Sequence, residues 1–515
     1  MLKRDISTLN VLIAGAGSMI GSGWLFSPFI SAQIAGPNAL ISWVIASVFM
    51  LFIALPLCEL GTMFPISGGM ANYPTMTHGK TVGFLFAWIT WISYVVMTPI
   101  EIQAILQYAS FFMPNLIKKG GDLFQLSGLG YVIAITIMLG VAFLNTFGIK
   151  LLAECNKYAS IFKFVVPSIA IMSLLSIAPS FQNATLNTTT ASAWENIFSA
   201  LSTGGIVFAF AGFQNGLMLA GEVKNPQRNL PIAILGAILV GFVFYFMLQL
   251  SFIVAIPHNF LSKGWAALNF PHASSPLVGL TALLGLGIVT KLLMIDASVS
   301  PFGTTLVYTA ATSRILYGMS LAQHLPPCFL KLNRYKVPSL TLYANVLIGI
   351  FSFLPFPSWQ KMVAFLSSAG ILSYGIGPIC LLAMRQLQKD THRPFKLAYS
   401  QFFCHTGFYV CNLMLYWCSF SIIWKLYVAI FIGLTFYLFY HKKKIYSLEK
   451  PVYWFCFYLT SIFLVSYLGS FGGLRWIVFP WDILIILPIS IAMLKLSQKC
   501  LTTEQISFPE CENIS

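Results

Sequence analysis

Two apolar segments of the chain, far apart in the sequence, are each interrupted by a cluster of glycines. The interruptions are residues 15–24 (GAGSMIGSGW) and residues 204–213 (GGIVFAFAGF). Glycine is about 1 kcal/mol less favourable than alanine inside a helix, and non-helical backbone at membrane depth must be buried in protein or line a cavity. Broken segments at corresponding positions of two halves are typical of secondary transporters made of inverted repeats. The pattern therefore predicts a transporter that holds its substrate at the two breaks.

The composition indicates a chain that lies largely within a membrane. Of its 515 residues, 58% are hydrophobic and 8% are charged, whereas a soluble domain has about 25% charged residues. This excludes a water-soluble enzyme. Lys3, Arg4 and Asp5 precede an apolar run without a small-residue cleavage site, so we expect the first segment to be retained as a span. The ten cysteines lack the spacing of metal ligands, and neither a metal nor a cofactor is expected.

Hydropathy predicts fourteen membrane spans, most of them near the ~20 residues that cross a bilayer. The division of residues 404–441 into two spans is the least defined, so the count ranges from 12 to 14. The segment 257–284 is expected to be an outer loop that ends in a short surface helix. The expected spans are 9–32, 38–63, 82–113, 129–149, 158–178, 196–221, 229–256, 285–312, 339–356, 361–386, 404–424, 426–441, 452–471 and 479–497.

The basic residues predict the orientation of these spans. With the N-terminus inside, two of the 29 lysines and arginines fall within spans, six fall outside and the remaining 21 lie in cytoplasmic segments. This asymmetry follows the positive-inside rule. The net charge of +15 therefore reflects topology, with membrane lipid as a secondary partner, and nucleic acid is not expected as a partner. The six outer residues are Lys118, Lys119, Lys263, Lys361, Lys425 and Arg475.

Motifs around the breaks resemble one family of permeases. The second break continues into residues 220–231 (AGEVKNPQRNLP), and this exit, together with the glycine-broken first span, resembles the amino acid–polyamine–organocation (APC) superfamily. Residues 21–26 (GSGWLF) and 296–304 (DASVSPFGT) are most similar to the bacterial aspartate/proton symporters. Further similar stretches are 88–101, 148–150 and 313–326.

The resemblance covers residues 10–400 and implies an all-α fold. It implies a ten-helix core of two inverted five-helix repeats over residues 1–400, with broken helices one and six. Residues 401–500 are expected to form additional C-terminal spans, and residues 501–515 a cytoplasmic tail. No nucleotide-binding loop is present, so the chain has no ATPase domain of its own.

The resemblance also implies where an amino acid substrate binds. Half-helix N-termini carry about half a positive charge and free N–H groups, which suit a carboxylate, and the opposing carbonyl groups suit an ammonium. Phe208 or Phe210 is expected to close over the ligand, although packing against lipid explains either residue as well. Gln214 stands where some exchangers of the family have a glutamate. The expected site comprises Ser18, Met19, Ile20, Gly21, Ser22, Gly23, Phe208, Ala209, Phe210, Ala211 and Gly212.

Ionisable side chains inside predicted spans are candidates for proton coupling, because they are costly at membrane depth. Glu101, Asp296 and Lys163 are the candidates, whereas Lys291 lies near the start of its span and can extend its ammonium outward. The alternative for the two acids is a protonated or hydrogen-bonded packing contact. For Lys163 the family implies a built-in cation that contacts the first span and the hydroxyls of the eighth, such as Ser300 and Thr304. Its alternative is a lysine that reaches the cytoplasmic face.

These observations predict uptake of an amino acid across the cell membrane with a proton, and no enzyme activity. An amino acid exchanger is the alternative within transport. A membrane-integral acyltransferase is a remote alternative, because it needs a His/Asp pair at a cavity. Five of the seven histidines lie in loops or at span ends, namely His78, His258, His272, His324 and His392. The breaks have no nearby arginine for an acidic side chain, so the identity of the amino acid stays open.

Overall fold

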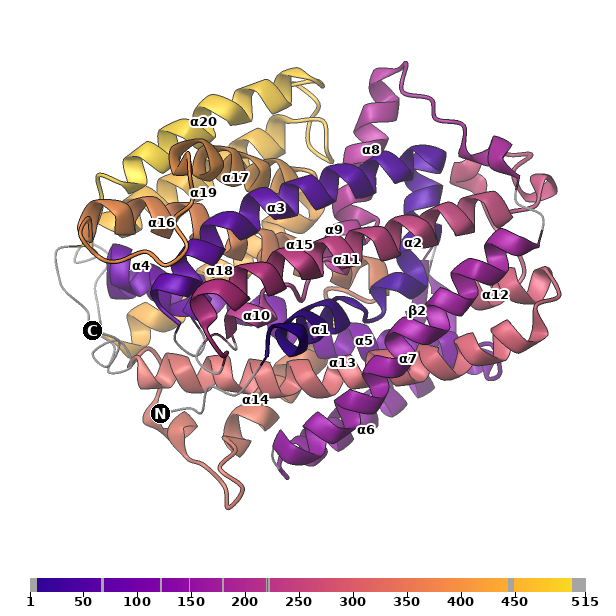
Figure 1. The fold of residues 1–515 in the computed structure, drawn as a ribbon, viewed down its shortest axis with the longest axis horizontal. Coiled ribbons are helices and arrows are strands. Elements are labelled where there is room, and N and C mark those ends of the chain that lie inside the picture. The colour runs from indigo at the N-terminus through magenta and orange to yellow at the C-terminus, as the bar shows by residue number, and fades with distance from the viewer. Residues whose placement is uncertain are drawn as a thin grey trace.

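The structure is a computed structural model that describes residues 7–65, 69–120, 123–147, 149–177, 180–218, 220, 223–442 and 449–502. Within these residues the chain is almost entirely helical, as predicted. The predicted tail from residue 503 onward, Gly148 and residues 221–222 of the exit motif lie outside the described residues. The fold is that of a polytopic all-α membrane protein (Figure 1).

The helices of the first half are α1 Thr8–Met19, α2 Gly23–Ala35, α3 Ala39–Met63, α4 Gly69–Val95, α5 Met97–Ala109, α6 Gly128–Asn145, α7 Ile149–Ser176, α8 Ala191–Thr203, α9 Ile206–Ala209, α10 Asn215–Met218 and α11 Pro226–Ala255. The later helices are α12 Pro276–Leu283, α13 Gly287–Leu321, α14 Ser339–Ser352, α15 Trp359–Tyr374, α16 Ile376–Leu387, α17 Ser400–Tyr416, α18 Phe420–Tyr440, α19 Lys450–Leu468 and α20 Trp481–Ser497. The strands β1 Ile117–Gly120 and β2 Leu123–Leu126 form one antiparallel hairpin.

Seven helical stretches of the described residues are long and apolar enough to cross a membrane. Most of the other predicted spans fall on shorter helices, such as α14, α17 and α20, and one falls on the 35-residue helix α13, which carries Lys291, Asp296 and Arg314. The seven stretches are Gly23–Met63, Asn72–Ala109, Gly128–Asn145, Pro226–Ala255, Trp359–Leu387, Phe420–Tyr440 and Lys450–Leu468.

Several predicted boundaries are wrong. The turn between α17 and α18 lies at residues 417–419 rather than near 425, because Ser419 takes a positive φ of 75° inside a continuous apolar run. Helix α7 begins at Ile149 instead of 158, so Lys163 lies deeper in its helix than expected. The third predicted span, 82–113, lies on the continuous apolar stretch Asn72–Ala109, which begins ten residues earlier than predicted and in which α4 and α5 meet at Val96.

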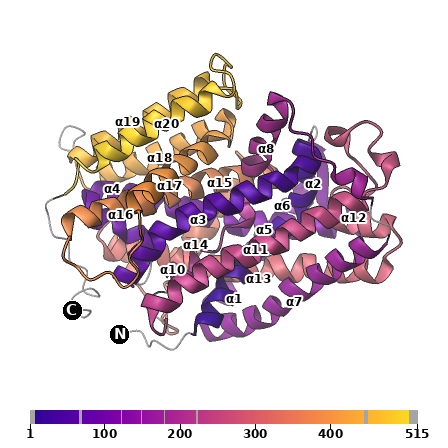
Figure 2. The ribbon, with the colours of Figure 1, turned by 45° about the horizontal axis from the view of Figure 1, so that its top comes forward.

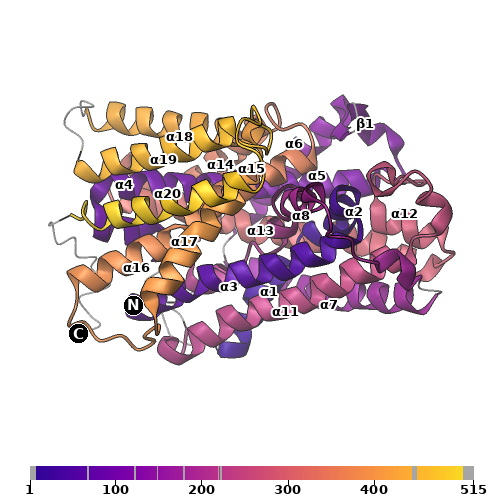
Figure 3. The same cartoon turned by 90° about the horizontal axis from the view of Figure 1, so that it is seen from above.

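Two elements on the loops also differ from the expectation. The helix that ends the segment 257–284 is α12, and it is buried rather than on the surface, because its apolar residues pack against α2 and α13. The hairpin β1–β2 was not predicted, since its two strands are only four residues long each. Both elements lie at the end of the molecule opposite to α16 (Figure 3).

The late helices cover one side of the arrangement. Helices α17 to α20 gather on one flank, whereas α1, α7 and α13 lie together on the other (Figure 2). Helix α3 packs against α11, α16 and α17, and thereby connects the central helices to the late ones.

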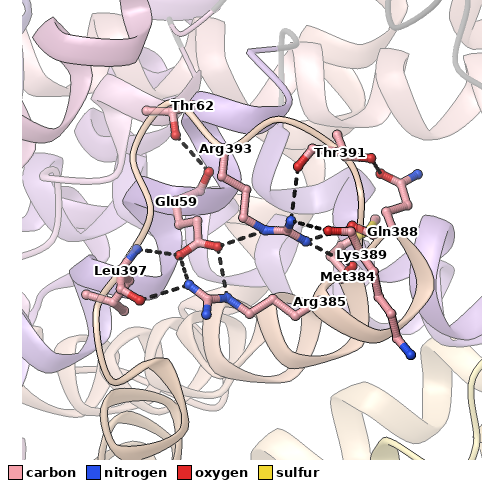
Figure 4. Close-up of polar contacts among 9 residues, drawn as sticks. All are labelled: Glu59, Thr62, Met384, Arg385, Gln388, Lys389, Thr391, Arg393 and Leu397. Atoms are coloured by element: carbon pink, nitrogen blue, oxygen red, sulfur yellow. Dashed lines mark hydrogen bonds and ion pairs between the residues drawn. The ribbon is translucent and has the colours of Figure 1, made fainter.

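An ionic network connects α3 to α16 and to the segment that follows α16. The buried carboxylate of Glu59 accepts two hydrogen bonds from Arg385, at 3.0 and 2.6 Å, and one from the backbone N–H of Leu397, at 2.8 Å. Arg393 approaches the same carboxylate, with Nε 3.3 Å from Oε1 (Figure 4). Two arginines and one amide therefore compensate a carboxylate that has no exposure to solvent.

Candidate substrate and proton site

The first break separates α1 from α2 at residues 20–22. Helix α1 begins after Ser7, whose hydroxyl accepts a hydrogen bond from the Asn10 amide and caps the helix. It ends at Met19, and α2 starts at Gly23. The break thus presents the carbonyl end of one half-helix and the N–H end of the other, which are complementary to an ammonium and a carboxylate. It is shorter than the glycine pattern suggested, because Gly15 and Gly17 are helical.

A side chain of the protein already occupies the N–H end of this break. The amide of Ser22 donates to Oε2 of Glu101 at 2.7 Å, and the Ser22 hydroxyl donates to Oε1 at 3.1 Å. Glu101 comes from α5 and is fully buried. Gly21 permits the contact, because a Cβ at this position would lie 2.6 Å from Oε1 of Glu101. The Glu101 carboxyl group therefore sits where the half-helix end would attract an anion.

The carbonyl end of the break is held by two long side chains. The Tyr245 hydroxyl, from α11, donates to the Met19 carbonyl at 2.7 Å. The ammonium of Lys163, from α7, donates to the Gly17 carbonyl at 3.0 Å. The Ser18 hydroxyl bonds back to Ala14 within α1. The last carbonyls of α1 are thus partly satisfied by neighbouring helices rather than by solvent.

Lys163 connects α1 to α13 and lies near both buried acids. Its side chain is 1% exposed, and its ammonium also donates to the Thr304 hydroxyl at 2.8 Å. It lies within electrostatic reach of Glu101 and Asp296. Ser300 was expected to contact Lys163. Its hydroxyl instead donates a hydrogen bond to Oδ1 of Asp296, at 2.6 Å. Glu101 and Lys163 therefore bind the two ends of the first break, and Asp296 lies near Lys163 without contacting the break.

The second break packs directly onto the first. Gly205 has a φ of 87°, which favours glycine, and its carbonyl accepts a hydrogen bond from the Ser27 hydroxyl at 3.1 Å. Gly212 has a φ of 132°, and a Cβ there would lie 2.7 Å from backbone atoms of Ser18 and Met19. The Gln214 side chain caps this turn, because its Oε1 accepts the Gly212 amide at 2.8 Å. Glycine is thus required where the two breaks touch.

The two candidate lid residues face different ways. Phe208 packs over Gly23, and its ring meets Trp359 edge to face, with centroids 5.7 Å apart. Phe210 instead packs against Trp43 on α3, with centroids 5.9 Å apart. Ala209 and Ala211 are buried without polar side chains. Of the two phenylalanines, Phe208 is therefore the one at the first break.

Trp359 is a site residue that sequence reasoning missed. Its indole N–H donates to the Ser22 hydroxyl at 3.0 Å, so it covers the same serine that holds Glu101. It begins α15 next to the helix-capping residue Ser358, whose hydroxyl accepts the Lys361 amide. The only signal in the sequence was an aromatic residue two positions before the tenth predicted span. Tyr245 was missed as well. The sequence gave no signal for it, because a single tyrosine in an apolar span resembles ordinary packing.

The predicted site residues are thus brought together from both halves of the chain. Residues 18–23 contact the second break at Gly212 and Phe208, and Glu101 and Lys163 bind the two ends of the first break. Asp296 does not contact either break. Its Oδ1 accepts a hydrogen bond from Ser300, and its Oδ2 has no hydrogen-bond partner among the described residues. The described residues hold no cluster of three metal-ligating side chains.

Comparison with known proteins identifies the family. A sequence model of the amino acid permease family matches residues 6–465. The chain belongs to the amino acid permease family. It is 37% identical over 505 residues to the glutamate/serine transporter AimA of Bacillus subtilis, covering 95% of this chain and 92% of that protein.

Other permeases are similar along most of the chain. It is 34% identical over 493 residues to the aspartate-proton symporter of Bacillus subtilis, with 94% of each chain covered. It is 24% identical to the branched-chain amino acid permease BcaP of the same organism, over 86% of this chain and 94% of that protein. The resemblance seen in the motifs is therefore confirmed, and this permease is a multi-pass membrane protein of amino acid transport.

Proposed function

We propose that this permease takes up an amino acid together with a proton. The observation that carries the proposal is the hydrogen bond from the Ser22 amide to the buried carboxyl group of Glu101. The N–H end of α2 is the natural binding position for a substrate carboxylate. Because Glu101 holds this position, a substrate must displace it. A proton weakens the hold of Glu101, since a neutral carboxyl group is a poorer acceptor than a carboxylate.

The proposal links the proton to the substrate by competition. When an oxygen of Glu101 carries a proton, the carboxyl group leaves the Ser22 amide at lower cost, and the substrate carboxylate takes its place. The substrate ammonium then lies toward the carbonyl end of α1. Proton and substrate thereby enter the same state, which is the requirement for symport. Coupling is a free-energy relation and works in both directions.

Lys163 is the second part of the proposed coupling. Its charged ammonium pins α7 to the Gly17 carbonyl of α1 and to the Thr304 hydroxyl of α13. Loss of its proton removes the positive charge that strengthens both hydrogen bonds, and thereby weakens the hold of α7 and α13 on the first half-helix. Asp296 is proposed as an acidic partner of this lysine, because it lies close enough for the two charges to interact.

The proposed orientation places the termini in the cytoplasm and the hairpin β1–β2 outside the cell membrane. It is supported by the 21 of 29 basic residues on the inner side, counted over the predicted spans. Two relatives support an amino acid with an acidic side chain among the substrates, because one is named a glutamate/serine transporter and another an aspartate-proton symporter.

The test is uptake of labelled amino acids into proteoliposomes that contain the purified protein. Aspartate, glutamate, serine and leucine are offered with and without an inward proton gradient. The proposal expects accumulation of at least one amino acid above its outside concentration when the gradient is present, and equilibration without it. Uptake that needs a counter-substrate in the lumen and ignores the gradient would establish an exchanger and overturn proton symport.

A further inference from the structure

A cavity leads from the hairpin end of the molecule to the covered break. It has a volume of about 250 Å³, slightly below the range of about 300–1,000 Å³ of most ligand pockets. Phe26 and Trp359 line its buried base, with ring centroids 4.6 Å apart. Because the Trp359 indole binds Ser22, one side chain separates the cavity from the candidate substrate site. A substrate that arrives from this end meets the cavity first.

Among the described residues, one charged side chain lines this cavity, and it is Lys119 of β1. Across the hairpin Lys119 pairs with Phe124, which lines the cavity as well. Its neighbour Lys118 pairs with Gln125, and neither of these lines the cavity. Successive residues of a strand point to opposite faces, so the hairpin presents one lysine to the cavity and one away from it.

The charge of Lys119 is available to a ligand. The side chain is exposed, and no ion-pair partner for it exists among the described residues. The walls around it are largely apolar, including Phe29, Ile30 and Leu123. Apolar walls focus the field of a charge into a cleft and raise the local concentration of ions of opposite sign.

The other polar groups of the cavity suit the ammonium of an amino acid. Gln33 and Gln107 use their amide nitrogens to bind the carbonyls of Leu268 and Ser274, at 2.9 and 3.0 Å. Within the described part of the chain neither side-chain oxygen accepts a hydrogen bond, so both can accept one from a ligand. The Lys119 ammonium and the two glutamine oxygens together match a ligand that has a carboxylate and an ammonium group.

We propose that this cavity is an outer recognition site for amino acids with an acidic side chain, and that Lys119 selects them. An acidic amino acid carries a net negative charge, whereas a neutral amino acid carries none, so the positive charge of Lys119 attracts the former more strongly. The candidate substrate site has Lys163 as its cation, and that lysine is bound to Gly17 and Thr304. Lys119 therefore supplies a cation that the sequence around the breaks lacks. This inference rests on the proposed amino acid uptake.

The experiment compares the uptake of acidic and neutral amino acids by variants at the two lysines of the hairpin. Initial rates of uptake of aspartate, glutamate and serine are measured in cells that express wild type, Lys119→Ala, Lys119→Arg or the matched control Lys118→Ala, with rates normalised to surface abundance. For Lys119→Ala we expect a KM for the acidic amino acids raised about 3- to 10-fold, with KM for serine unchanged. Lys119→Arg and Lys118→Ala should behave as wild type. Raising the ionic strength should reduce the difference between wild type and Lys119→Ala, because salt screens the attraction.

Equal effects of Lys119→Ala on acidic and neutral amino acids would overturn the selective role of Lys119. So would an equal loss in Lys118→Ala, since a general positive surface would then be responsible. Wild type that takes up none of the three amino acids would instead contradict the proposed function itself. If Lys119→Ala does not reach the cell surface, the same comparison is made with Lys119→Gln. This variant removes the charge but keeps a long polar side chain.

Discussion

The amide of Ser22 donates a 2.7 Å hydrogen bond to Oε2 of Glu101, a residue 79 positions further along the chain. This contact places a carboxyl group of the protein on the half-helix end that is best suited to a substrate carboxylate. Trp359 covers the contact from one side through the Ser22 hydroxyl. In the proposed mechanism, substrate binding and proton uptake therefore meet at Ser22.

Gly21→Ala should reduce uptake at least about tenfold, which corresponds to about 1.4 kcal/mol. The new methyl group would lie 2.6 Å from Oε1 of Glu101, so it would fill space shared by Glu101 and the substrate carboxylate. The control is Gly140→Ala, because a Cβ there would meet nothing within 4 Å. The measurement is saturable uptake at equal amounts of inserted protein. Undiminished uptake by Gly21→Ala would place the substrate elsewhere.

Ser22→Trp tests the same position with a larger side chain. An indole at the first break would occupy the volume of the substrate, so binding should be lost while the protein remains inserted. Gly212 does not serve this purpose, because its φ of 132° and its contact with Ser18 and Met19 make any side chain disruptive. Binding is measured by the shift in melting temperature on adding substrate, and a wild-type shift in Ser22→Trp would argue against the broken-helix site.

Lys163→Ala should abolish accumulation against a gradient. The substitution removes the hydrogen bonds to the Gly17 carbonyl and the Thr304 hydroxyl, and with them the proposed proton-dependent link between α1 and α13. Lys291→Ala is the control, because this lysine lies on α13 with an exposed side chain. Proteoliposomes with an imposed proton gradient provide the measurement. Near-normal accumulation by Lys163→Ala at every pH would assign the lysine a structural role only.

Much of this arrangement was predictable from local pattern, and some of it was not. The two breaks and the acidic candidates followed from glycines and charges inside apolar runs, because both features are costly in a membrane. The contact between Ser22 and Glu101 could not be predicted from the sequence, because it depends on how α5 packs beside α2. The turn at Ser419 was misplaced, because no glycine or proline marks it in the sequence. Trp359 was missed, because an aromatic residue at a span end is common.

Glu59→Gln should lower the thermal stability of the purified protein. The buried carboxylate is surrounded by Arg385, Arg393 and the Leu397 amide, and removing its charge leaves two arginines uncompensated (Figure 4). Loss of one partner of a buried ion pair costs about 3–5 kcal/mol. Arg385 is partly exposed, so a value near the lower end is expected.

The control for Glu59 is Glu195→Gln. Its partner Arg475 is 71% exposed and lies 3.9 Å away, and exposed pairs of this kind contribute about 0–1 kcal/mol. Thermal unfolding in detergent is measured for both variants. Equal melting temperatures for Glu59→Gln and Glu195→Gln would show that the network around Glu59 does not stabilise the fold.

The orientation is testable with two single-cysteine variants on a cysteine-free background. One retains Cys328, which is exposed in the segment after α13, and the other carries Lys263→Cys in the segment after α11. A membrane-impermeant maleimide added to intact cells should label position 263 and leave Cys328 unlabelled until the cells are opened. The reverse pattern would invert the proposed topology.

The pH dependence of substrate affinity, in wild type and in Glu101→Gln, tests the competition at Ser22 most directly. In wild type the dissociation constant should rise with pH, by up to ~10-fold per unit where Glu101 is ionised, because the carboxylate then competes for the Ser22 amide. Glu101→Gln keeps the shape of the side chain without the titrating proton, so its affinity should not depend on pH over the same range. The same slope in wild type and in Glu101→Gln would contradict the account.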